Sequence, residues 1–158
     1  MSVPTWKRKL SSAEFIYQTY RLNLRLGEIL INKPKKYKAN YTDHIIKTAL
    51  SALNHLQIAD SIFLSKYSSE LDFKIRRENL LLARGEIEGI ATDCYIFLEI
   101  VRKHDYASQK VNDEKSSKIF DQELEIGEMC ESCYNLIKGV ITHDNEIYKS
   151  YIKPNVNS

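Results

Sequence analysis

Apolar residues recur along most of this chain at intervals of three and four, the spacing of a helix with one buried face rather than of a strand. The clearest series steps by 4, 3, 4, 3 and 4 and comprises Ala83, Ile87, Ile90, Cys94, Phe97 and Val101. The sequence contains no internal repeat and no strand-like alternation of useful length. The pattern therefore predicts an all-α protein.

Four long helices account for the pattern, at about residues 11–32, 41–67, 70–103 and 113–142. The first begins near Ser11, because Ser11 and Glu14 have the spacing of a capping box, and it ends before Pro34. Ser69 and Asp72 can cap the third helix. Short connections between long helices favour an antiparallel up-down four-helix bundle.

The predicted bundle covers residues 11–142, between a basic arm at 1–10 and a tail at 143–158 that holds one short helical turn around 147–151. The apolar series of the second helix is Ile46, Ala49, Leu53, Leu56 and Phe63. The residues expected to face inward from the fourth helix are Phe120, Leu124, Cys133, Tyr134, Ile137 and Val140.

The first helix has apolar residues on two sides. Phe15, Leu22, Leu26, Ile29 and Leu30 cluster on one side, and Tyr17, Tyr20, Leu24 and Ile31 cluster on nearly the opposite side. A bundle helix needs one apolar stripe of roughly 100°. We therefore predict that the second face (Tyr17, Tyr20, Leu24, Ile31) is an interface with another subunit. The alternative is that the arm or the tail of the same chain covers it.

The amino-acid composition indicates which cellular compartment to expect. The 158 residues contain three cysteines, an odd number, which points to a reducing cytoplasm rather than to a disulfide scaffold. The sequence has no run of about 18 apolar residues, so it predicts no membrane-spanning helix. No apolar segment follows the basic residues near the N-terminus, so we expect no signal peptide.

Positive charge is concentrated in the first third of the chain. Residues 1–50 carry ten Lys and Arg against three Asp and Glu, a net +7, whereas the whole chain has a net charge of +2. A basic surface can attract a polyanion, although solubilising lysines give the same pattern. The residues that we expect to contact nucleic acid are Arg21, Arg25, Lys35, Lys36, Lys38, Arg76, Arg77 and Arg84. In an up-down bundle the third helix begins at the end opposite the 33–38 linker, so these residues form a strip or separate patches.

Catalytic signatures are missing from the sequence. None of the four histidines has a Glu three residues before it, so the di-iron pattern of some bundles is not present. Cys130 and Cys133 form a single CxxC inside a helix, which favours core cysteines over a metal site. Gly85 and Gly89 are spaced to let two helices approach closely. We predict no enzymatic activity, no cofactor and no metal.

Several segments together resemble one protein family. They are residues 22–28 (LNLRLGE), 34–37 (PKKY), 52–60 and 76–86, with the basic arm before them. They are similar to the accessory variability determinant (Avd) family of diversity-generating retroelements and, more distantly, to the four-helix proteins encoded in intervening sequences of bacterial 23S ribosomal RNA genes. The resemblance covers roughly residues 12–103 and consists of helical patterns rather than catalytic motifs.

This resemblance implies a ring-like homo-oligomer, a pentamer of four-helix bundles with a basic surface. It also implies a non-catalytic protein that binds a reverse transcriptase and its template RNA, or an RNA/DNA hybrid, and supports mutagenic reverse transcription. The net charge of +2 favours a localised basic patch. The alternative hypothesis is a structural bundle that assembles with a protein partner and does not bind nucleic acid.

Overall fold

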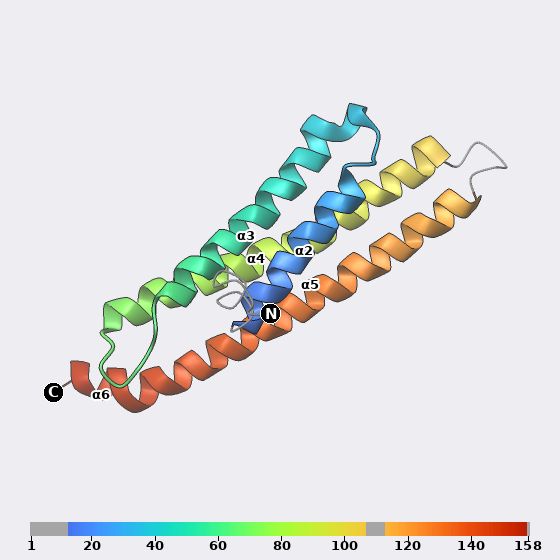
Figure 1. Cartoon of the computed structure of the whole chain (residues 1–158). Coiled ribbons are helices and arrows are strands. Elements are labelled where there is room, and N and C mark those ends of the chain that lie inside the picture. The colour runs from blue at the N-terminus through green and yellow to red at the C-terminus, as the bar shows by residue number, and fades with distance from the viewer. Residues whose placement is uncertain (1–12, 107–112, 158) are drawn as a thin grey trace, which may run out of the picture.

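The computed structural model describes residues 13–106 and 113–157. Within these ranges the chain forms four long helices and no strand: α2 (Glu14–Leu30), α3 (Asp43–Ser61), α4 (Glu70–Val101) and α5 (Asp113–Ile147). Successive helices run in alternating directions (Figure 1). Helix α2 packs against α3 and α5, and α4 packs against the same two helices. The predicted all-α protein with four long helices is confirmed.

Short helical segments join or extend the long helices. A 3-10 turn, η1 (Lys35–Tyr37), and a π-helical turn, η2 (Lys38–Thr42), lead from α2 into α3. A second π-helical turn, η3 (Arg102–Tyr106), extends α4. Beyond α5 come a third, η5 (Tyr148–Ile152), and the short helix α6 (Lys153–Val156).

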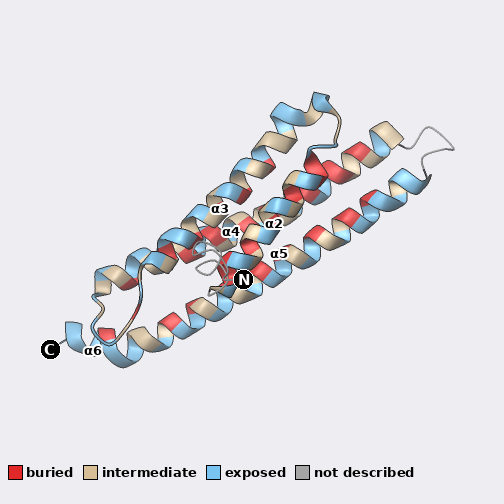
Figure 2. Cartoon of the chain, viewed as in Figure 1, coloured by how far each residue is buried: buried red, intermediate tan, exposed pale blue. Residues whose placement is uncertain are grey.

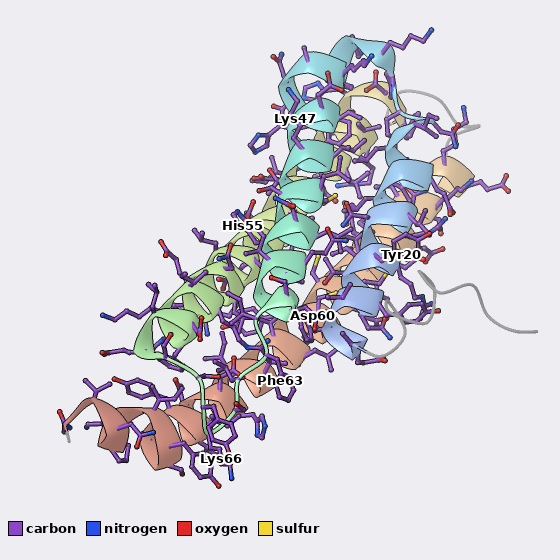
Figure 3. All side chains as sticks on the ribbon, turned by 60° about the vertical axis from the view of Figure 1, so that its left-hand side comes forward. Tyr20, Lys47, His55, Asp60, Phe63 and Lys66 are labelled. Atoms are coloured by element: carbon purple, nitrogen blue, oxygen red, sulfur yellow. The ribbon has the colours of Figure 1, made fainter. Side chains whose placement is uncertain are left out.

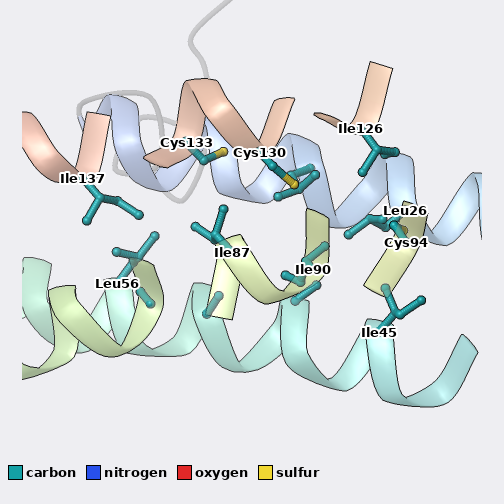
Figure 4. Packing of buried hydrophobic residues seen from close by; sticks show 14 of the residues in the cluster. Leu26, Ile45, Leu56, Ile87, Ile90, Cys94, Ile126, Cys130, Cys133 and Ile137 are labelled. Carbon is teal, nitrogen blue, oxygen red and sulfur yellow. The ribbon is translucent and has the colours of Figure 1, made fainter. Parts of the chain in front are cut away.

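The core follows the predicted seam of α4. All six residues of that seam are buried, and Ile87, Ile90 and Cys94 face Ile126, Cys130 and other α5 residues in the interior (Figure 4). Buried residues recur along the inner side of each long helix, and most of the residues between them are half-buried or exposed (Figure 2). Each fully buried Leu or Ile side chain contributes roughly 1.5–3 kcal/mol, which is why the seams determine the packing.

The inward face of α5 differs from the prediction. Cys133 and Ile137 are buried as expected, but Phe120 and Leu124 are exposed. The buried stripe is Ile119, Gln122, Ile126, Cys130, Cys133, Ile137, Ile141 and Asp144, which steps by 3, 4, 4, 3, 4, 4 and 3. This is an eleven-residue period of about 3.67 residues per turn. Two polar residues occupy positions on it, so a search for apolar positions alone shifts the register.

Two helix ends also differ from the prediction. Helix α3 was expected to reach residue 67, but it ends at Ser61, and the following Ile62 is extended. Phe63, which the prediction placed in the apolar series, is 85% exposed on the connection to α4. Helix α5 continues past the expected end near residue 142 to Ile147. The turn expected near 147–151 is η5, whose Ile152 packs with Leu64 and Phe73 in a second, smaller core.

The capping prediction for the third helix is confirmed. The Ser69 side chain accepts a hydrogen bond from the Asp72 backbone N–H at 3.1 Å, and the Asp72 side chain accepts one from the Ser69 backbone N–H at 3.1 Å. Ser11, the expected cap of the first helix, lies outside the described residues, as does the arm 1–10. None of the described helices is long and apolar enough to cross a membrane.

Candidate subunit and nucleic-acid interfaces

The second face of α2 is uncovered among the described residues. Leu24 is 49% exposed and Ile31 is 78% exposed, Tyr17 is exposed, and Tyr20 is half-buried. The opposite face, with Leu22 and Leu26, is fully buried. The tail does not cover this face, because α5 carries it to the far end of the bundle (Figure 1). The described chain therefore leaves one side of the helix open, and the arm at 1–10, the other segment that could cover it, lies outside the described residues.

This face continues onto α3 as an apolar groove. Tyr20, Leu24 and Gly27 form one wall, Ile46, Leu50 and Leu53 form the other, and the cavity between them has a volume of about 300 Å³. Figure 3 shows Tyr20 projecting from α2. Leu50 is 55% exposed. We define these six residues as the α2–α3 groove. The predicted apolar series of the second helix contains Ile46 and Leu53 but not Leu50, so the pattern did not indicate an exposed apolar face on α3.

Asn23 fixes the spacing of the two helices beneath the groove. Its Nδ2 donates hydrogen bonds to the carbonyl oxygens of Thr19 and Ala49, both at 3.0 Å. Thr19 lies one turn before Asn23 on α2, and Ala49 lies on α3. This polar bridge holds the walls at a set distance, so the groove is part of the folded bundle rather than a chance gap.

The linker lysines lie where α2 turns into α3. Lys35, Lys36 and Lys38 are all exposed. Lys36 Nζ pairs with Asp105 Oδ1 at 2.6 Å, and Tyr37 Oη donates to Asp105 Oδ2 at 2.8 Å. The hydrogen bond to Asp105 raises the pKa of Lys36. Lys35 and Lys38 have no ion-pair partner among the described residues, so their charges remain available.

Tyr37 is a structural residue rather than an open stacking surface. Its ring meets Phe97 edge-on with centroids 5.6 Å apart, and Tyr41 stacks on the same Phe97 at 5.2 Å. The hydrogen bond to Asp105 raises the pKa of the Tyr37 hydroxyl. This aromatic cluster fastens the linker to α4, and it leaves the lysines, not the ring, facing outward.

Arg25 and Arg21 project from the same strip of α2 but differ in their partners. Arg25 forms a two-pronged ion pair with Glu125 on α5, through Nε to Oε1 at 2.7 Å and Nη2 to Oε2 at 3.0 Å, and its Nη1 lies 3.1 Å from Glu28 Oε2. The hydrogen bond to Glu125 raises the pKa of Arg25. Arg21 is exposed and has no such partner among the described residues. Arg25 therefore joins α2 to α5, whereas Arg21 is free to contact a ligand.

The remaining arginines lie toward the opposite end. Arg76 is enclosed, with its side chain 13% exposed and ion-paired to Asp144. The exposed Arg77 lies over the Phe73 ring at 5.8 Å, and the half-buried Arg84 lies over the Tyr134 ring at 5.7 Å. As expected, these residues are separated along the bundle from the 35–38 linker, since antiparallel α3 lies between the two ends. The basic residues do not converge on one pocket.

A lysine and a glutamine form a hydrogen-bonded pair near the linker between α2 and α3. The sequence did not predict this pair. Lys33 Nζ donates to Gln122 Oε1 at 2.7 Å, and the Gln122 residue is 7% exposed. Burial, and secondarily the charge of Lys118, lowers the pKa of Lys33. The signal in the sequence is Gln122 itself, one of two polar residues on the buried stripe of α5.

The cysteines lie in the core. Cys94, Cys130 and Cys133 are unpaired and buried (Figure 4). Burial raises the pKa of Cys94 and of Cys130 to about 12, so both are uncharged thiols at neutral pH and poor nucleophiles. Across the described ranges, no three His, Cys, Asp or Glu side chains are grouped to hold a metal ion.

Gly85 and Gly89, which are spaced for the close approach of two helices, make no such approach among the described residues. A Cβ built on Gly85 or on Gly89 meets nothing within 4 Å, so neither glycine makes a close contact with another described helix. Both lie on the stripe of α4 that carries Leu71, Leu82 and Ile96, which are exposed. This stripe also holds the exposed polar residues Glu78 and Thr92, and it is a second surface that the described helices leave uncovered, distinct from the α2–α3 groove.

Comparison with protein-family models, with curated proteins and with solved structures finds no match for the chain. The family resemblance therefore rests only on the sequence segments that carry it. The two uncovered surfaces and the positions of the basic residues are separate structural observations.

Proposed function

We propose that this protein is a non-catalytic accessory subunit of a retroelement, which binds a reverse transcriptase and its template RNA, or an RNA/DNA hybrid, as a homo-oligomer. The observation that carries the proposal is the α2–α3 groove, an exposed apolar surface on a bundle that also exposes Arg21, Lys35 and Lys38, which have no ion-pair partner among the described residues. Apolar surface of this kind on a water-facing helix indicates a protein contact, and unpaired lysines and arginines supply affinity for phosphates.

Ring assembly is consistent with the two uncovered surfaces. A closed ring needs a heterologous contact, in which one patch of each subunit meets a different patch of the next. The α2–α3 groove offers one patch. The α4 stripe offers the other, since Leu82 and Ile96 are each 47% exposed on it. We propose that the groove of one copy receives the α4 stripe of its neighbour, and that a pentamer results, as the family resemblance implies.

The cations proposed to contact RNA are fewer than the sequence suggested. Arg21, Lys35, Lys38 and Arg77 are exposed and have no carboxylate partner among the described residues. Arg76 and Arg25 bind carboxylates of α5, and Lys36 binds Asp105. A cation that is already paired gains less from a phosphate than a free one, because the existing pair must first be broken.

RNA binding tests the proposal. Fluorescence anisotropy with single-stranded template RNA should give an affinity that falls steeply between 50 and 200 mM salt, as release of counterions requires. Replacing Lys35 and Lys38 with Gln should lower the slope of log affinity against log salt by about 1.4, which is the value for two lost phosphate contacts to a single strand. The matched control carries Lys138→Gln and Lys149→Gln, two exposed lysines at the other end of the bundle.

The alternative is a structural bundle that binds a protein partner and no nucleic acid. It predicts that the reverse transcriptase is retained in a pull-down while no salt-dependent RNA affinity is measurable. An equal loss of affinity in the two double variants would show that net charge, and not the 35–38 linker, is responsible.

A further inference from the structure

Lys33 is held at the seam between α2 and α5. It follows the last turn of α2, and its Nζ donates a 2.7 Å hydrogen bond to Oε1 of Gln122. The Gln122 residue is 7% exposed and lies on the buried stripe of α5. Lys33 itself is half-buried. The ammonium group is therefore fixed in place by an amide from the interior, unlike a surface lysine that moves freely in water.

No carboxylate of the described residues balances this charge. A buried or half-buried ammonium group normally pairs with an acid, because removal from water penalises an isolated charge. Among the described residues no carboxylate oxygen lies within ion-pair distance of Lys33 Nζ. Three acids of the neighbouring helices are engaged elsewhere: Glu28 and Glu125 bind Arg25, and Asp93 pairs with His44.

A second ammonium group adds to the local positive charge. Lys118 lies one turn before Gln122 on α5 and is exposed. Its neighbours on α5, Glu114 and Asp121, are exposed and form no ion pair with it within the described chain. The charge of Lys118 acts on Lys33 and, after burial, is the next cause that lowers the Lys33 pKa. Two like charges that act on each other repel, and an anion bound near both would relieve the repulsion.

We propose that Lys33 and Lys118, with Gln122 as the positioning residue, form a binding site for a phosphate group. Gln122 occupies one of the three N–H donors of Lys33, which leaves two for an anion on the open side. A tetrahedral phosphate can accept hydrogen bonds from both ammonium groups at once, and lysine is a common phosphate ligand that acts as a point charge.

The phosphate has two possible sources, a free phosphate or nucleotide and the backbone of a bound RNA. The second source rests on the proposed function, because it places an RNA strand across the α2–α5 seam beside Lys35. The first source does not rest on it. The test therefore has two arms, so that the site and the function can fail separately.

The first arm uses inorganic phosphate. The side-chain amide signal of Gln122, identified by its loss in Gln122→Leu, is followed by NMR during titration with sodium phosphate and with sodium chloride at equal ionic strength. We expect a saturable shift with phosphate that chloride does not produce. The shift should be lost in Lys33→Met with Lys118→Met and retained in Lys47→Met. Lys47 is a matched control, because it is exposed on α3 with no ion-pair partner in the described chain (Figure 3).

A non-saturating shift, or one that persists in the double variant, would overturn the site. Lys118→Met alone keeps the test valid if the Lys33 substitution alters the fold, because Lys118 is exposed and its removal leaves the core untouched. Saturation by phosphate should also raise the melting temperature of the wild type and not that of the double variant, since a ligand that binds the folded state stabilises it.

The second arm uses single-stranded RNA. The double variant should lose about 1.4 from the salt slope of RNA affinity, and Lys47→Met should not. Phosphate saturation without any RNA affinity would support the site and refute the proposed function. Wild-type RNA affinity in the double variant, together with no phosphate response, would refute the site and leave the proposed function standing.

Discussion

Arg76 on α4 and Asp144 on α5 form an enclosed ion pair, with Nε 2.6 Å from Oδ2 and both side chains almost removed from solvent. The same guanidinium donates from Nη1 to the carbonyl oxygens of Ala59 at 2.9 Å and Ile62 at 3.0 Å. These carbonyls belong to the end of α3. Arg76 therefore joins three helices at one end of the bundle and satisfies backbone acceptors that the end of α3 leaves free.

Asp144→Ala should destabilise the fold by about 3 kcal/mol, because it leaves the Arg76 charge enclosed without its partner. Urea denaturation gives the free energy of unfolding. Glu146→Ala, an exposed acid two residues further along α5, is the control and should change the stability by less than about 0.5 kcal/mol. A loss below about 1 kcal/mol for Asp144→Ala would mean that the pair contributes no more than a surface ion pair.

Glu123 should make stability depend on pH. Burial, and then the hydrogen bond and charge of Glu99, raise the pKa of Glu123 to about 7. Arg102 holds Glu99 ionised through Nη2 to Oε2 at 2.7 Å, and it lowers the Glu99 pKa. Below pH 7 the Glu123 carboxyl keeps its proton and can donate it to Glu99. In the unfolded chain an ordinary Glu has a pKa of about 4.3, so the folded state binds more protons between about pH 4.3 and 7.

Stability should consequently fall as pH rises through this window, by about 1 kcal/mol, since solvent around the half-buried pair screens the interaction. Glu123→Gln keeps a donor for Glu99 and should flatten the pH dependence relative to wild type. Urea denaturation at pH 5, 6, 7 and 8 measures it, and Glu128→Gln on the exposed side of α5 is the control. An unchanged difference between pH 5 and pH 8 in Glu123→Gln would contradict the assignment.

The double substitution of Gly85→Ala and Gly89→Ala should raise the stability of the single subunit and weaken its assembly into an oligomer. Each glycine lies inside α4 with open space where a Cβ would be, so alanine should stabilise the isolated subunit by about 0.5–1 kcal/mol per site. If the α4 stripe meets a second copy, the added methyl groups should weaken the oligomer at the same time. Light scattering measures the mass of the oligomer and thermal melting measures the stability of the same sample, so the two effects can be told apart. A higher melting temperature with an unchanged oligomer mass would remove the glycines from the interface.

Charge in the α2–α3 groove should dissociate the oligomer. Leu24→Glu or Leu50→Glu places a carboxylate on a surface that we propose is buried between copies, and isolated charges are costly there. We expect the mass from light scattering to fall to that of one subunit while the helical circular-dichroism signal is retained. Val156→Glu, at an exposed residue of α6, is the control and should leave the mass unchanged. An oligomer that persists in both groove variants would show that this face is not the interface.

Local sequence determined much of the fold. The seam from Ala83 to Val101 follows the helical period with apolar residues at every position, and all of them are buried. Ser69 and Asp72 interact across one turn, so their capping box depends on no other part of the chain. The apolar residues on two sides of α2 could likewise be predicted, because they depend only on the spacing of residues within one helix.

Tertiary structure decided what depends on contacts between distant segments. Gln122 and Asp144 are polar, yet they occupy inward positions of α5 because Lys33 and Arg76 reach them from other helices. No local pattern marks such partners, since they are separated by 89 and 68 residues along the chain. The same contacts determine which cations are available. Arg25 and Lys36 are neutralised by acids far away in the sequence, whereas Arg21 and Lys35 have no acid partner in the part of the chain that the structure describes. Hydrophobic periodicity specifies the helices because burial depends on spacing within one segment, but the charge of a site depends on which side chains the packed helices bring together.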